Sequence, residues 1–156
     1  MSGIIKSSLA RKYAMALSGL FLVVFLLQHF TINLTSVFSE DVFNEISHFM
    51  GNNPLVQFVL QPILIFGVIF HFLMGFVLEL KNRSARAQNY AQNKGSANSS
   101  WMSRNMIWSG AVILSFLVLH FIDFWFPEMN YKYIESLPSD PNRYFEEMVH
   151  KFVNPI

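Results

Sequence analysis

The chain has 156 residues, of which 53% are hydrophobic, 16% aromatic and only 13% charged. So few charged side chains cannot cover the surface of a soluble domain, and the apolar residues are concentrated in three long blocks, which predicts a membrane protein with several spans. The absence of cysteine excludes thiolate-ligated haem, iron–sulfur clusters, disulfides and covalently attached haem on this chain. The net charge of +1 gives no indication of nucleic-acid binding.

The first apolar block, at about residues 13–35, follows a short basic N-terminal stretch. That stretch contains Lys6, Arg11 and Lys12 and no acidic residue. A basic start followed by an apolar run is typical of a signal peptide, but this run is about 20 residues long and no small-x-small cleavage site follows it. We therefore expect a retained first membrane span.

Residues 38–53 predict a short amphipathic helix at the membrane surface. They contain three acidic residues and no lysine or arginine. Their apolar residues recur at helical spacing: Val42, Phe43, Ile46, Phe49 and Met50. Asn53 followed by Pro54 is typical of an N-cap and a first helical position, so a second span is expected over residues 54–80. Pro62 lies inside this span and is expected to kink or loosen it.

The chain becomes basic and polar after the second block, with no acidic residue over residues 81–104. A third apolar block follows at residues 105–126, and we expect a third span there that ends at Pro127. The remaining residues, 128–156, are polar and of mixed charge, and they predict no further span.

The positive charges predict how the chain is oriented. Eight of the eleven lysines and arginines lie before the first span or between the second and third spans, and the connection between the first two spans has none. By the positive-inside rule, the N-terminus is cytoplasmic. The sequence thus predicts an all-α, multi-pass transmembrane helix bundle that forms a single domain over residues 1–156.

Each apolar block contains one histidine: His29, His71 and His120. A histidine in hydrocarbon is costly unless the protein supplies a partner for it, so each is a candidate functional residue. At about 1.5 Å per residue, His29 and His120 lie ~24 Å from the cytoplasmic ends of their spans, whereas His71 lies ~15 Å from that side. Two haems stacked across the membrane, each held by histidines from two helices, would need this pattern.

Glycines surround the second of these histidines. Gly67 and Gly75 lie one helical turn before and after His71, on the same face. The missing side chains would leave room for a flat ligand such as haem beside the imidazole. The alternative is a histidine that is hydrogen-bonded to a neighbouring helix, with the glycines needed only for close helix packing. Ser18 and Gly19 in the first block allow the same two interpretations.

Several short motifs occur in order along the chain. They are Arg11-Lys12-Tyr13 leading to Ser18-Gly19-Leu20, Gln28-His29, Phe43-Asn44 with His48-Phe49-Met50, Phe70-His71 and Leu119-His120. In order and spacing, over essentially the whole chain, they resemble the motifs of the membrane-anchor cytochrome b subunit of succinate dehydrogenases and fumarate reductases, of the single-subunit, two-haem type.

The resemblance implies a set of haem ligands. His29 and His120 would hold the iron of an outer, distal haem b, and His71 would be one ligand of an inner, proximal haem. The family has five spans, and the partner of His71 would lie on a fourth. This sequence ends before such a span begins, so we expect it to be a fragment of a longer protein, with one complete bis-histidine pair. Asn154-Pro155 is typical of the approach to another helix.

The resemblance also implies a function in electron transfer at the bacterial inner membrane. A flavoprotein subunit would interconvert succinate and fumarate, and an iron–sulfur subunit would pass electrons to the haems. The quinone, which is expected to be menaquinone, would react near the distal haem. A bis-histidine haem has no open coordination position, so this subunit would carry electrons without acting on succinate itself. Its partners would be these two subunits, the quinone and membrane lipid, without nucleic acid.

Two other functions stay open from the sequence. A two-haem cytochrome b serving a hydrogenase or formate dehydrogenase would share the span histidines but not the His48-Phe49-Met50 motif. A haem-free membrane scaffold or transporter subunit would use its histidines as structural or proton-carrying groups. His48 itself is a candidate for a quinone pocket or for a structural role at the interface. Asp123, one turn from His120, is a candidate for quinone or proton chemistry, and His150 is expected to be solvated.

Overall fold

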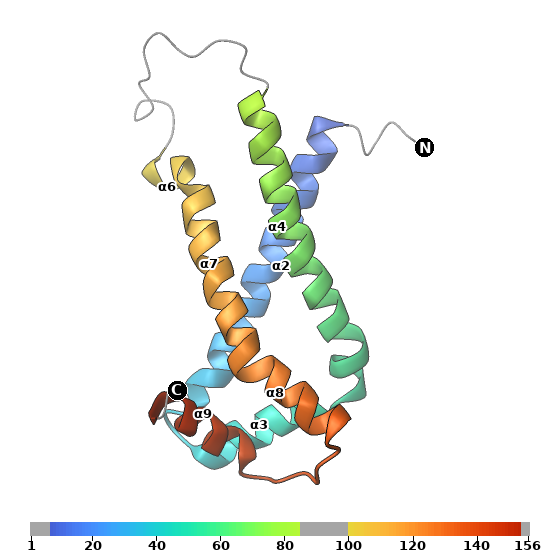
Figure 1. Cartoon of the computed structure of the whole chain (residues 1–156), viewed down its shortest axis with the longest axis vertical. Helices are drawn as coiled ribbons and strands as arrows, with labels where there is room; N and C mark the ends of the chain where they lie inside the picture. Colours follow the sequence, from blue (N-terminus) through green and yellow to red (C-terminus); the bar gives the residue numbers. More distant parts are fainter. Residues whose placement is uncertain (1–6, 85–99, 154–156) are drawn as a thin grey trace. The chain divides into compact units, whose positions relative to one another are not determined.

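The computed structural model describes residues 7–84 and 100–153, and within these ranges the chain is helical and contains no β-strand. The α-helices are α2 (Ser8–Thr35), α3 (Glu40–Asn52), α4 (Gln61–Ser84), α6 (Trp101–Arg104), α7 (Met106–His120), α8 (Phe126–Met129) and α9 (Arg143–Val153) (Figure 1). Three π-helical turns, η1 (Val56–Leu60), η2 (Phe121–Trp125) and η3 (Asn130–Ile134), are inserted among them. The predicted all-α class is confirmed.

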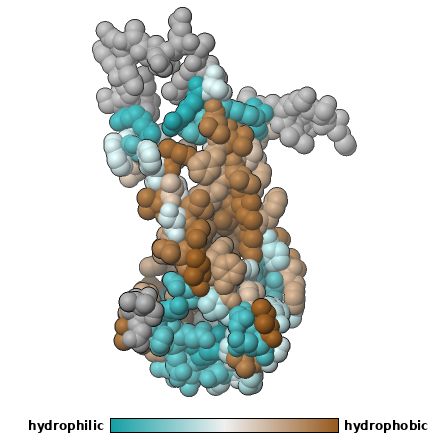
Figure 2. Space-filling model, in the orientation of Figure 1, coloured by the Kyte–Doolittle hydropathy of each residue, from teal (hydrophilic) through white to brown (hydrophobic). Residues whose placement is uncertain are grey.

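Three continuous helical segments are long and apolar enough to cross a membrane: Leu9–Thr35, Val56–Ser84 and Met106–Ile134. Within the described part of the chain, the most apolar stretch of each segment has no residue buried inside the protein, as expected for helices that face lipid. Hydrophobic side chains gather along these long helices (Figure 2). The protein is therefore an all-α membrane protein with three helices of spanning length.

The expectation that Pro127 stops the helix of the third span is wrong, because the helix continues to Ile134. Pro127 is the second residue of α8, and this helix follows directly after the π turn η2. In that turn the N–H of Phe126 bonds to the carbonyl of Phe121, five residues earlier. The wider turn accommodates a proline, which has no N–H and whose ring would clash with the preceding turn of a regular α-helix.

The second span contains the same combination of a π turn and a proline. Pro62 is the second residue of α4 and follows η1, where the N–H of Gln61 bonds to the carbonyl of Val56. The prediction that Pro62 loosens this helix is confirmed. The predicted N-cap is confirmed as well, since Oδ1 of Asn53 accepts hydrogen bonds from the N–H groups of Leu55 at 2.9 Å and Val56 at 3.4 Å.

The amphipathic helix predicted over residues 38–53 is α3. It begins after Ser39, whose side-chain oxygen accepts a hydrogen bond from the N–H of Val42 at 3.3 Å. Two acidic residues occupy its first turn, where the helix dipole favours negative charge. The cap and the charges together explain why the helix starts here, directly after the first membrane span.

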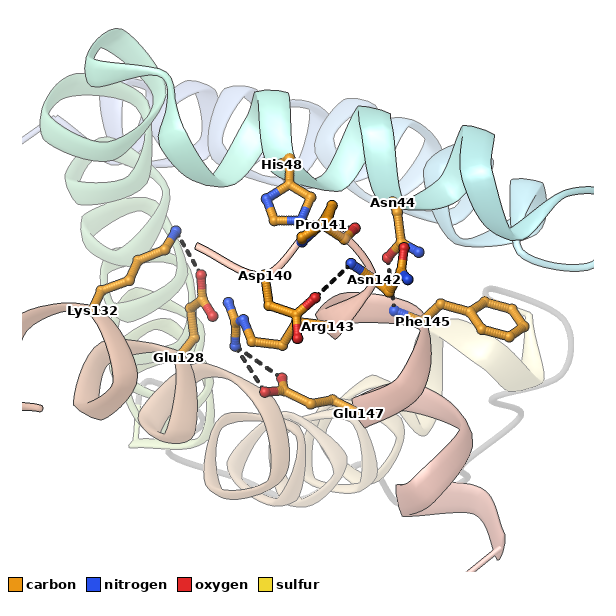
Figure 3. A network of polar contacts seen from close by, with 10 residues as sticks. All are labelled: Asn44, His48, Glu128, Lys132, Asp140, Pro141, Asn142, Arg143, Phe145 and Glu147. Carbon is orange, nitrogen blue, oxygen red and sulfur yellow. Dashed lines mark hydrogen bonds and ion pairs between the residues drawn. The ribbon is translucent and has the colours of Figure 1, made fainter. Parts of the chain in front are cut away.

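The C-terminal part of the chain contains an amphipathic helix, α9, that was not predicted. It contacts α3, since the N–H of Phe145 donates to Oδ1 of Asn44 at 2.9 Å and the Phe145 ring meets that of Phe43 edge-on at 6.3 Å. Among the described residues, only Phe43, Asn44 and Arg143 are buried. All three belong to α3 and α9, so the buried residues of the described chain lie in this helix pair, and Figure 3 shows Asn44 of α3 beside Phe145 of α9.

The chain divides into two compact units. One consists of residues 1–71 and 137–156, and the other of residues 72–136. The first unit thus contains α2, α3, α9 and the beginning of α4. Among the candidate functional residues, His29, His48 and His71 belong to the first unit, and His120 belongs to the second.

Candidate functional site

His71 lies in α4, and a side-chain hydrogen bond joins it to α2. Its Nδ1 atom is 2.9 Å from the Oγ atom of Ser18, a residue 53 positions earlier in the chain. The same Oγ atom is also 2.9 Å from the carbonyl oxygen of Met15, to which it donates a hydrogen bond. A serine hydroxyl that bonds back to the carbonyl of the preceding turn is common in helices. The sequence singled out Ser18 only as a small residue, so this role was missed.

The two hydrogen bonds of Ser18 fix the tautomer of a neutral His71. A hydroxyl has one proton, and Ser18 donates it to Met15, so toward His71 its oxygen can only accept. The proton of the neutral imidazole must then be on Nδ1, and the lone pair must be on Nε2. This assignment follows from the hydrogen-bond network. A neutral imidazole binds a metal through such a lone pair, while its other nitrogen donates to a protein acceptor.

The glycines close to His71 are used for helix packing. A Cβ atom at Gly19 would lie 3.2 Å from Cε1 of His71, so the missing side chain lets the imidazole approach α2. A Cβ atom at Gly67 would lie 3.0 Å from Cε1 of Phe21, so a phenylalanine ring fills the space that was predicted for a flat ligand. At these two glycines the structure therefore favours the packing interpretation.

His29 and His120 both stack on a phenylalanine one turn earlier in their own helix. The ring centroids of Phe25 and His29 are 5.5 Å apart, with 22° between the ring planes. Those of Phe116 and His120 are 5.9 Å apart, with 20° between the planes. Each stack orients its imidazole relative to its own helix. Because the two histidines belong to different compact units, their pairing on one haem remains a prediction.

His48 takes part in the contact between α3 and α9. Its Nε2 atom is 3.1 Å from the carbonyl oxygen of Pro141, and its ring meets that of Tyr144 edge-on at 4.8 Å. Its Nδ1 atom is 3.4 Å from Nδ2 of Asn52. Figure 3 shows the ring directed toward Pro141. Because both ring nitrogens have protein partners, the structure favours the structural role of His48 over a quinone pocket.

Two further candidates lie in different environments. Asp123 is half-buried in the π turn η2, three residues after His120, and its role in quinone or proton chemistry remains a prediction. His150 is exposed in α9, as expected for a solvated side chain.

The donor atoms at His71 fit a haem ligand. In the described part of the chain, no three His, Cys, Asp or Glu side chains are grouped so that they could hold a metal ion. Haem does not need such a group, because the porphyrin supplies the equatorial nitrogens and the protein supplies only axial ligands. An imidazole with a protonated Nδ1, held by an acceptor, and a lone pair on Nε2 is what an axial ligand requires. His71 meets this requirement.

A serine of another helix thus contacts His71, whereas a phenylalanine one turn earlier stacks on His29 and on His120, and the ring of Phe124 also lies 5.2 Å from that of His120. The family resemblance depends on these histidines and on the short motifs around them. Comparisons of the chain with protein-family models, with curated proteins and with solved structures find no match.

Proposed function

We propose that this chain is the haem-b-containing membrane anchor of a succinate:quinone oxidoreductase, either a succinate dehydrogenase or a fumarate reductase. It transfers electrons between an iron–sulfur subunit and menaquinone in the bacterial inner membrane. The observation that carries the proposal is the state of His71, which lies in an apolar helix of spanning length with its Nδ1 bound by Ser18 and its lone pair on Nε2. One histidine in each of the other two spanning helices supports it.

Three histidines would hold haem in this proposal. His29 and His120 are the ligands of the distal haem, and His71 is one ligand of the proximal haem. Bound haem supplies one-electron transfer, because two imidazole ligands leave no open coordination position. The chain itself holds the imidazoles in place: stacked phenylalanines orient His29 and His120, and Ser18 keeps the proton of His71 on Nδ1.

The distribution of charge supports the proposed orientation. By the positive-inside rule, the lysines and arginines before the first span and between the second and third spans support a cytoplasmic position for these segments. The flavoprotein and iron–sulfur subunits would bind on that side, next to the proximal haem. Quinone would react on the opposite side, near the distal haem.

The test is a dithionite-reduced minus oxidised absorbance spectrum of the complex purified from membranes with its associated subunits, together with pyridine haemochrome quantitation. We expect a b-type band that is reduced by succinate. His29→Ala or His120→Ala should each remove one and the same haem, and His71→Ala should remove the other. His150→Ala is the matched control, because it changes an exposed histidine of α9. An intact complex without haem, or one that retains both haems in these variants, would contradict the proposal.

The packing around His71 favours a second candidate, a haem-free membrane scaffold. A histidine that is hydrogen-bonded to the neighbouring helix, next to glycines that permit close approach, also stabilises a helix pair in lipid. For a scaffold, His71→Ala would lower the thermal stability of the protein, and neither the wild type nor the variant would show a haem band. The same purified samples therefore separate the two functions.

A further inference from the structure

We propose that Ser18 is a positioning residue for His71: it fixes the tautomer and the rotation of this imidazole and thereby lowers the reduction potential of the haem that His71 binds. This inference rests on the proposed function, since it concerns the haem ligand that the proposal assigns. Ser18 would contact neither the iron nor the porphyrin and would act only through the ring of His71.

The position of the proton on the imidazole follows from the two bonds of Ser18. The Ser18 hydroxyl is 2.9 Å from the Met15 carbonyl oxygen and 2.9 Å from Nδ1 of His71. A hydroxyl that makes both of these hydrogen bonds must donate to the carbonyl, which can only accept, and therefore presents a lone pair to Nδ1. Residues of two separate helices thus select the tautomer whose lone pair is on Nε2.

The rotation of the ring depends on the same hydrogen bond. Gly19 has no side chain, and a Cβ atom there would lie 3.2 Å from Cε1 and 3.8 Å from Nδ1 of His71, so the glycine gives this ring edge room to approach α2. The hydrogen bond to Ser18, the adjacent residue, is made by the same edge. A rotation of the ring about χ2 would break this bond, so Ser18 fixes the rotation.

The hydrogen bond to Ser18 would also act on the iron of a haem bound by His71. An acceptor on the Nδ1–H group increases the electron density of the imidazole and makes Nε2 a stronger donor. A stronger donor stabilises ferric haem more than ferrous haem, so the bond to Ser18 lowers the reduction potential. Loss of the bond should therefore raise the potential of this haem and leave the haem of the other pair unchanged.

The experiment is a redox titration of both haems, followed by absorbance, in the membrane complex that carries Ser18→Ala. We expect unchanged haem content and a higher potential for the haem that is lost in His71→Ala. A tenfold loss of preference for the ferric state corresponds to a shift of ~59 mV for a one-electron couple. Ser18→Thr should restore the wild-type potential, because a helical threonine hydroxyl can also bond back to the preceding turn.

Ser109→Ala is the matched control. Ser109 makes the same kind of hydrogen bond, from its Oγ atom to the carbonyl of Met106 three residues earlier at 3.0 Å, and its side chain is exposed on α7. Its removal should leave both potentials unchanged. An equal shift in Ser109→Ala would overturn the inference, because the effect would then come from the helix and not from the bond to His71.

The remaining outcomes separate this inference from the proposed function. A wild-type complex without haem overturns both, whereas a haem-containing wild type whose potential does not move in Ser18→Ala overturns the inference alone. If Ser18→Ala prevents assembly, Gly19→Ala is the second test. Its new Cβ atom would displace the His71 ring and stretch the same hydrogen bond, so it should raise the same potential. An unchanged potential in that variant overturns the inference.

Discussion

Two helix contacts within the first compact unit are made from different residue types. The contact between α3 and α9 buries Phe43 and Asn44 and combines an aromatic pair with a hydrogen bond from backbone to side chain. The contact between α2 and α4 at His71 instead relies on missing side chains at Gly19 and Gly67 and on a hydrogen bond between side chains. The first contact thus fills space with large side chains, and the second lets a ring of each helix approach a glycine of the other.

The difference follows from what surrounds each contact. Helices α3 and α9 carry many polar and charged residues (Figure 2), so burying a phenylalanine between them removes it from water and is favourable. Two apolar helices in lipid gain no hydrophobic stabilisation from their contact, because lipid is as apolar as their side chains. Close packing and hydrogen bonds must therefore hold them together. A polar imidazole is therefore costly in the second contact and ordinary in the first. For this reason His71 is a stronger functional candidate than His48.

The largest effect is expected for Phe43→Ala, which empties the packed centre of the first contact. Phe43 is only 6% exposed, and truncation of a buried phenylalanine costs about 3 kcal/mol or more. Amide hydrogen exchange in α9 should therefore become more than about 100-fold faster. Phe49→Ala is the control on the same helix, since Phe49 is 62% exposed and should leave the exchange nearly unchanged. Similar exchange rates in both variants would show that Phe43 does not hold α9.

A smaller effect is expected for Asn44→Ala in the same contact. The substitution removes the acceptor of the part-buried Phe145 N–H group, and loss of such a hydrogen bond costs about 1 kcal/mol or more. The exchange of this amide should accelerate by roughly tenfold or more, and the first turn of α9 should be affected before its last turn. Glu45→Ala, at the exposed neighbouring position, is the control. Protection of the Phe145 amide at the wild-type level would contradict the assigned bond.

The smallest effect is expected for Gly67→Ala in the membrane-embedded contact. The added Cβ atom would lie 3.0 Å from Cε1 of Phe21, and this ring can move by a few tenths of an ångström, so we expect a cost of about 1 kcal/mol. Thermal unfolding in detergent should show a slightly lower midpoint. Gly110→Ala is the control, because its Cβ atom would have no described neighbour within 4 Å. A midpoint that falls equally in both variants would exclude helix packing as the reason for Gly67.

The sequence predicted the features that depend on local composition. The three spans and α3 follow from runs or spacings of apolar residues, and the Asn53 cap follows from the Asn-Pro pair, because each is decided by neighbours within a few positions. Helix α9 carried a readable signal that was overlooked: Phe145, Met148, Val149 and Phe152 recur at helical spacing. The helix of the third span was wrongly expected to end at Pro127, because here the proline follows a π turn that accommodates it.

The candidate site was predictable in its residues but not in its contacts. An imidazole within an apolar run is visible in the sequence, so His29, His71 and His120 could be singled out. The bond between Ser18 and His71 joins positions 53 apart, and the bond between Asn44 and Phe145 joins positions 101 apart. No local pattern specifies such pairs, because they depend on how two helices rotate against each other.

The π turn η1 preserves the rotational phase of the second long helix. Its carbonyls bond five residues ahead, so it contains one residue more than an α-helical turn would need. The wider turn absorbs this extra residue, so the residues after it keep the phase of an α-helix that is one residue shorter. Deleting one residue from Val56–Leu60 would therefore restore the α-helical turn and leave His71 directed toward Ser18. Deleting one residue from the regular helix between Gln61 and His71 would instead rotate the imidazole by about 100° around the helix axis, away from Ser18.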